Sequence, residues 1–81
     1  MILTGAQIRA ARALIGITRS ELAYQARLHP NAVKYWEVRD TIPRYQPYAV
    51  GRIERCLERL GVVAFADPHP GVRLSILDNF A

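Results

Sequence analysis

Apolar residues recur at helical spacing in four stretches of the chain, separated by short polar segments or segments that contain Gly or Pro. The first stretch predicts a helix from Thr4, its N-cap, to about Ile15. Gly16 can then adopt the left-handed conformation that ends many helices. Three further helices are predicted over about 19–26, 29–38 and 47–60. The domain is therefore expected to be mostly α-helical.

The second and third predicted helices carry the most informative pattern, in the window RSELAYQARLHPNAVKYWEV from Arg19 to Val38. Ala23 lies on the apolar face of the first of these helices, where a small side chain lets another helix cross closely. Val33 and Trp36, three residues apart, supply apolar side chains on the second. Two short helices crossing through a tight turn are typical of the helix-turn-helix unit, whose second helix enters the major groove of DNA.

Local signals agree with these boundaries. Thr18 and Glu21 have the spacing of a capping box at the start of the second helix. Pro30 suits the first turn of the third helix, because its φ angle is preset and no intrahelical donor is lost there. Gly61 is expected to end the fourth helix.

The last twenty residues change character. The runs Val62–Phe65 and Val72–Ile76 are β-prone and flank the turn-rich segment ADPHPG, which predicts a β-hairpin. A hairpin alone is only marginally stable, so this one should pack on the helices or pair with a second copy. We expect residues 1–61 to form the helix-turn-helix domain and 62–81 a hairpin and tail. The predicted dimer contacts are Val62, Phe65, Leu74 and Ile76.

Composition and charge bear on the partners and the cellular compartment to expect. The formal net charge is +4 and ten of the eleven basic residues are Arg, which suits phosphate binding but fits an Arg-rich proteome equally well. The single Cys56 forms no internal disulfide and lies on the inward side of its predicted helix. We find neither a signal peptide nor an apolar run long enough to span a bilayer. We expect a cytoplasmic, nucleoid-associated protein without a membrane partner.

The sequence offers little for catalysis. His29 and His69 lack Cys, His or carboxylate partners at metal-ligand spacing, and we see no nucleophile–base pair or phosphate-cradling Gly motif. We therefore expect no enzyme, no metal and no cofactor.

The chain resembles the Cro/C1 (XRE-like) helix-turn-helix transcriptional regulators, which are common in bacteria and their phages. The resemblance covers about two-thirds of the chain and rests on IRAAR at 8–12, GITR at 16–19, ELA at 21–23, and Val33, Trp36 and Glu37. It implies a four-helix, lambda-repressor-like helix-turn-helix domain, here followed by a short C-terminal β-hairpin. It also implies a sequence-specific regulator of transcription, foremost a repressor, that binds double-stranded DNA as a homodimer on a near-palindromic site.

The family's use of its helices assigns roles by position. The N-terminal half of the third helix reads bases, and the corresponding residues here are Pro30, Asn31, Lys34 and Tyr35. Asn31 could pair with adenine and Lys34 with guanine. Pro30 could contact a thymine methyl group, and Tyr35 could stack against one or donate to a phosphate. The expected phosphate contacts are Arg19, His29, Arg39, Arg44, Tyr45 and Gln46. His29 could equally serve only as the cap of its helix.

The resemblance also implies a partly buried ion pair between Arg12 and Glu37, joining the first helix to the end of the third. The sequence departs from the family where Arg27 stands in place of the turn Gly, which predicts a non-Gly residue at positive φ. Arg19 in place of Gln and His29 in place of Ser or Thr bear on the DNA contacts.

Two other functions fit the same pattern. An antitoxin would repress its own operon with this domain and hold a toxin through its C-terminal segment, whose apolar residues include Val62, Phe65, Leu74, Ile76, Leu77 and Phe80. A protein-interaction adaptor would keep the fold and lose DNA binding. A neighbouring toxin gene would favour the antitoxin, and loss of salt-dependent DNA affinity would favour the adaptor.

Overall fold

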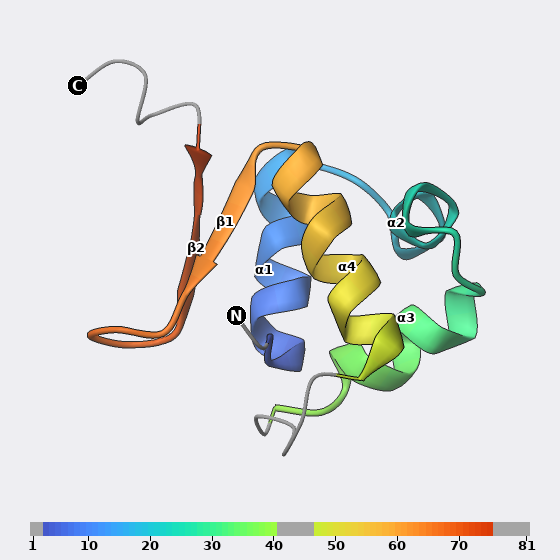
Figure 1. Ribbon diagram of the computed structural model, residues 1–81, viewed down its shortest axis with the longest axis horizontal. Helices are drawn as coiled ribbons and strands as arrows, with labels where there is room; N and C mark the ends of the chain where they lie inside the picture. The colour runs from blue at the N-terminus through green and yellow to red at the C-terminus, as the bar shows by residue number, and fades with distance from the viewer. Residues whose placement is uncertain (1–2, 41–46, 76–81) are drawn as a thin grey trace.

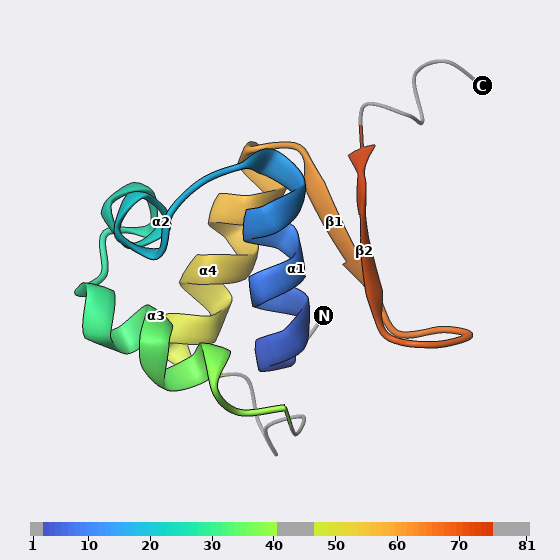
Figure 2. The same ribbon diagram turned by 180° about the vertical axis from the view of Figure 1, so that it is seen from behind.

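The computed structural model describes residues 3–40 and 47–75. Four helices are followed by an antiparallel hairpin: α1 Gly5–Ile15, α2 Arg19–Ala26, α3 Pro30–Glu37, α4 Tyr48–Arg59, β1 Val62–Phe65 and β2 Gly71–Leu74. Viewed from either side, α1 and α4 stand between the α2–α3 pair and the hairpin (Figures 1 and 2). The prediction of a mostly helical chain with a short C-terminal hairpin is confirmed.

The helix ends lie close to where the sequence placed them, because local capping determines them. Thr4 and Thr18 each accept a hydrogen bond from the backbone N–H three residues on, and each capping box is complete. Gly16 ends α1 in the left-handed region at φ 69°. α3 is one residue shorter than predicted at each end, since His29 is its cap and Val38 already leaves helical geometry.

The core forms where the apolar faces of all four helices and β1 meet. Leu22 and Ala23 of α2 and Val33 of α3 have no exposed surface, as predicted for two helices that cross closely. The remaining buried apolar residues are Leu3, Ile8, Ala11, Ala26, Val50, Ile53, Cys56, Leu57 and Val62. Burial raises the pKa of the Cys56 thiol, against a smaller opposing effect of Arg59, so this thiol is a core group.

Gly5 marks the closest approach between α1 and the end of α3. Its N–H donates to the Arg39 carbonyl at 2.7 Å. A Cβ atom at this position would lie 2.4 Å from the Glu37 carbonyl oxygen and 2.6 Å from those of Trp36 and Arg39. Only Gly therefore fits where α1 begins.

The hairpin is fastened to α1 by a buried side chain. Gln7, which completes the first capping box through its Oε1, donates from Nε2 to the Phe65 carbonyl at 2.8 Å and to the Gly71 carbonyl at 3.1 Å. Phe65 and Gly71 are paired across the hairpin, and a Cβ on Gly71 would lie 2.6 Å from the Phe65 ring. The predicted packing of the hairpin on the helices is confirmed.

This packing buries surface of the predicted dimer contacts within their own chain. Val62 is only 2% exposed and belongs to the core of its own chain, so it offers almost no surface to a second copy. Leu74 is partly buried against the same core. Phe65 is also partly buried, with its ring against Gly71. The fourth predicted contact, Ile76, lies outside the described residues.

Candidate nucleic-acid interface

The turn between α2 and α3 is built on Arg27 in the left-handed region. Its φ and ψ are 57° and 48°, and its N–H donates to the carbonyls of Ala23 and Tyr24. The next N–H, of Leu28, donates to the Ala23 carbonyl at 2.8 Å. The positive φ expected from the resemblance is confirmed. The left-handed conformation of Arg27 turns the chain from α2 into the segment that leads to α3. Glycine would adopt this conformation with less strain.

His29 caps α3 with its ring. The Nδ1 atom accepts a hydrogen bond from the Asn31 N–H at 3.0 Å, and the backbone of His29 is extended while Pro30 begins the helix. Of the two roles considered for His29, the structure shows the cap. This use of Nδ1 fixes the orientation of the ring at the start of α3.

The outward face of α3 carries the four predicted base-reading residues. Pro30, Asn31, Lys34 and Tyr35 are all exposed, while Val33 on the opposite face is fully buried. Trp36 is partly buried and packs against the core. The helix therefore presents an amide and an ammonium group, both suited to base edges, on a surface backed by close packing.

Tyr35 is already engaged within the chain. The guanidinium carbon of Arg39 lies 3.3 Å from the centroid of its ring, and Arg39 Nη1 donates to the Tyr35 carbonyl at 2.6 Å. The Trp36 ring meets the Tyr35 ring edge-on, with centroids 4.8 Å apart. One face of the ring is thus covered by Arg39. Tyr35 and Arg39 form one unit at the end of α3 rather than two independent contacts.

The predicted ion pair between Arg12 and Glu37 is confirmed, and it has a third member. Glu37 has no exposed surface, and Arg12 binds both of its carboxylate oxygens, with Nη2 3.0 Å from Oε1 and Nε bound to Oε2. Arg19 Nε donates to the same Oε1 at 3.1 Å. Residues of α1 and α2 thereby share one buried carboxylate of α3.

The structure thus gives Arg19, which the sequence suggested as a phosphate contact, a carboxylate partner within the chain. Its side chain is 40% exposed, so one edge of the guanidinium binds Glu37 while part of the group reaches solvent at the N-terminus of α2. Arg9 adds a neighbouring tie: it donates to the Glu37 carbonyl and, from Nη2, to Asp40 Oδ1 at 3.2 Å. We call Arg9, Arg12, Arg19 and Glu37 the Glu37 cluster.

The other predicted phosphate contacts, Arg44, Tyr45 and Gln46, lie outside the described residues. Sequence reasoning missed the roles of Gly5, Gln7 and Arg9. For Gln7 a signal was present, since Thr4 and Gln7 have capping-box spacing, although its bonds to the hairpin have no sequence signature. Gly5 and Arg9 act across the α1–α3 contact, which no local pattern encodes.

Comparison with known protein families and with characterised protein sequences finds no match to this chain. In residues 3–40 and 47–75, no helix is long and apolar enough to cross a membrane. The same part of the chain contains no group of three His, Cys, Asp or Glu side chains placed to hold a metal ion.

Proposed function

We propose that this protein is a sequence-specific regulator that binds double-stranded DNA through the outward face of α3. The observation that carries the proposal is the exposure of Asn31 and Lys34 on a helix whose inner face is fixed by Val33 and whose end is held by the Glu37 cluster. Such rigid presentation of polar side chains is what base readout in the major groove requires.

The surroundings of α3 support the same proposal. The N-terminus of α2 carries Arg19, partly exposed, where a phosphate group would meet both a guanidinium and the positive end of a helix. Arg39, stacked on Tyr35, supplies a second cation beside the end of α3. Phosphate contacts on both sides of a reading helix would set its register in the groove.

We further propose a lambda-repressor-like arrangement used as a dimer. Two reading helices related by a two-fold axis would enter successive major grooves about 34 Å apart and would require a near-palindromic site. A single module of this size buries only about 600–1,000 Å² on DNA, so a second copy would supply much of the specificity. The hairpin, whose Phe65 and Leu74 keep part of their surface exposed, is the proposed contact between copies.

The proposal is tested by selecting binding sites from a library of random duplexes and then measuring affinity for the selected site. We expect recovery of a near-palindrome. Asn31→Ala and Lys34→Gln should each weaken binding to it by about tenfold or more, since a good base contact contributes about 1–3 kcal/mol. Ala10→Glu, at an exposed position of α1, lowers the net charge by the same amount as Lys34→Gln; it is the control and should change affinity much less.

Two results would contradict the proposal. One is recovery of no preferred sequence from the library. The other is equal weakening by Lys34→Gln and Ala10→Glu, which would mean that only net charge matters. Light scattering of each variant confirms that its assembly state is unchanged before the affinities are compared.

A further inference from the structure

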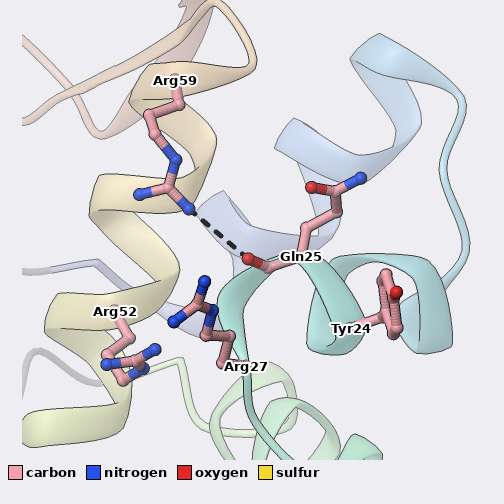
Figure 3. Close-up of a pocket in the computed structure, with 5 residues that line it drawn as sticks. All are labelled: Tyr24, Gln25, Arg27, Arg52 and Arg59. Carbon is pink, nitrogen blue, oxygen red and sulfur yellow. Dashed lines mark hydrogen bonds between the residues drawn. The ribbon is translucent and has the colours of Figure 1, made fainter.

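A second group of arginines surrounds the C-terminal end of α2, away from the Glu37 cluster. Arg27 in the turn and Arg52 and Arg59 of α4 line an open pocket of about 630 Å³ together with Tyr24 and Gln25 (Figure 3). Arg55 joins Arg52 and Arg59 around a smaller adjoining hollow of about 70 Å³. We call Arg27, Arg52, Arg55 and Arg59 the arginine pocket.

Two of these arginines, Arg52 and Arg59, join α4 to the end of α2 through hydrogen bonds. Arg52 Nε donates to the Ala26 carbonyl at 2.8 Å and its Nη1 to the Tyr48 hydroxyl at 2.9 Å, while Arg59 Nη2 donates to the Gln25 carbonyl at 3.4 Å. The bonds to Ala26 and Gln25 satisfy carbonyls at the end of α2 and place positive charge at the negative end of its dipole. Helix capping thus accounts for one hydrogen bond of Arg52 and one of Arg59.

Capping does not account for the charge that remains. Within residues 3–40 and 47–75, neither hollow is lined by an Asp or Glu side chain. Arg27 points toward α4, between Arg52 and Arg59 (Figure 3). Arg55 is exposed beside the same two residues. Guanidinium groups gathered without a carboxylate repel one another, and that repulsion is relieved by a bound anion.

The backbone at Arg27 supplies an independent observation. A left-handed conformation costs a non-Gly residue roughly 1–2 kcal/mol, and glycine would make the same turn without that cost. Here the strained residue is an arginine whose side chain enters the pocket. Strain retained at one position is a pointer to function at that position.

We propose that the arginine pocket binds phosphate groups, in the first place those of a small phosphorylated molecule of nucleotide size. Arginine forks match phosphate oxygens in pairs, and the pocket volume is within the range of small-ligand sites. Tyr24, 84% exposed on α2, offers an aromatic ring at the rim for a base or other flat group. The phosphates of a DNA backbone carry the same chemistry and are the other possible source.

The test measures pyrophosphate and adenosine diphosphate binding by calorimetry at low ionic strength, about 10 mM, where charge is little screened. We expect both to bind. Arg27→Gly and Arg55→Gln should each weaken binding about tenfold, the effect of losing one charge-assisted contact. Arg27→Gly relieves the backbone, so its loss of binding cannot be ascribed to unfolding. Arg73→Gln is the charge-matched control and should bind as the parent does.

A second arm separates the two sources of phosphate and does not depend on the proposed reading of DNA by α3. If adenosine diphosphate binds equally well with a saturating duplex present, the site takes a free ligand. If the duplex displaces it, and Arg27→Gly and Arg55→Gln each lower the salt dependence of duplex binding by about one phosphate contact, the source is the DNA backbone. The inference is overturned if neither compound binds, or if Arg73→Gln weakens binding as much as the pocket variants do.

Discussion

The two ends of α2 place arginines in opposite electrostatic settings. At its N-terminus, Arg19 joins Arg12 around the buried carboxylate of Glu37. Because α2 has eight residues, its C-terminus lies about 12 Å from its N-terminus. Arg27 follows that end and belongs to a group of arginines whose hydrogen-bond partners are backbone carbonyls and one hydroxyl group. The first group is neutralised in part and fixes α3. The second keeps its charge on the surface.

An Arg-rich composition therefore does not by itself indicate a binding surface. Arg9 and Arg12 are engaged in the contact of α1 with the end of α3, where both bind Glu37. Arginines without a carboxylate partner retain more of the field that attracts phosphate than an arginine that shares one, such as Arg19. The two groups of arginines differ because the first surrounds the buried carboxylate of Glu37, and a buried charge must be paired.

The largest effect is expected at the centre of the Glu37 cluster. Glu37→Ala leaves the guanidinium groups of Arg12 and Arg19 without their carboxylate in a partly buried setting, which should lower the free energy of unfolding by about 3–5 kcal/mol. Chemical denaturation measures it. Asp40→Ala is the control, since Asp40 pairs with Arg9 in solvent and its loss should cost less than about 1 kcal/mol. Equal losses in both variants would show that burial does not separate the two pairs.

Gly5→Ala should have the next largest effect, because it pushes α1 away from the carbonyls at the end of α3. We expect a loss of about 1–3 kcal/mol, toward the upper end because backbone atoms cannot rotate aside. Ala6→Ser, on the exposed face one residue along, should change stability little. Gly5→Ala should also weaken DNA binding while leaving anion binding at the arginine pocket unchanged. An unaltered melting temperature would contradict the close contact.

At the other end of α2, substitution should raise stability. Arg27→Gly removes the cost of the left-handed conformation, and we expect a gain of about 1 kcal/mol. Arg27→Ala removes the same side chain but keeps the strained backbone, so it should not show that gain. Thermal melts of the three proteins separate the contribution of the backbone from that of the charge. A gain shared by both variants would mean that charge repulsion, not backbone strain, dominates.

The smallest effect is expected from the capping box at the start of α2. Hydrogen bonds from the backbone and side chain of Thr18 lower the pKa of Glu21 below its usual 4.5. A carboxyl whose pKa is lower in the folded state adds stability above its unfolded pKa and loses it as the pH falls through the folded pKa. The melting temperature of Glu21→Gln should therefore lie slightly below that of the parent at pH 7. The two should converge as the pH falls below about 4. A gap that is constant with pH would contradict this.

The helices and the hairpin could be predicted because their signals are local. Capping by Thr4 and Thr18, the stop at Gly16 and the turn-rich segment before Gly71 each act within a few residues. The pair of Arg12 and Glu37 was expected only through a family resemblance, since the residues are 25 positions apart.

What could not be predicted depends on how the helices pack. Three contacts join separate elements and have no local signal. They are the bond of Arg19 to the Glu37 carboxylate, the approach of Gly5 to three carbonyls, and the bonds of Gln7 to both strands. Val62 was placed on a dimer surface because a β-prone run does not reveal which of its side chains the core will bury. The arginine pocket likewise forms only when α4 lies against the end of α2.

Base reading by α3 is tested by measuring binding to the DNA upstream of this protein's own gene, beside a shuffled duplex, over a series of salt concentrations. We expect tight binding to the native duplex that stays well above the control at about 150 mM salt, because base contacts survive where phosphate attraction is screened. Lys34→Gln should remove most of that difference. Equal binding to both duplexes that fades together with salt would contradict base reading by α3.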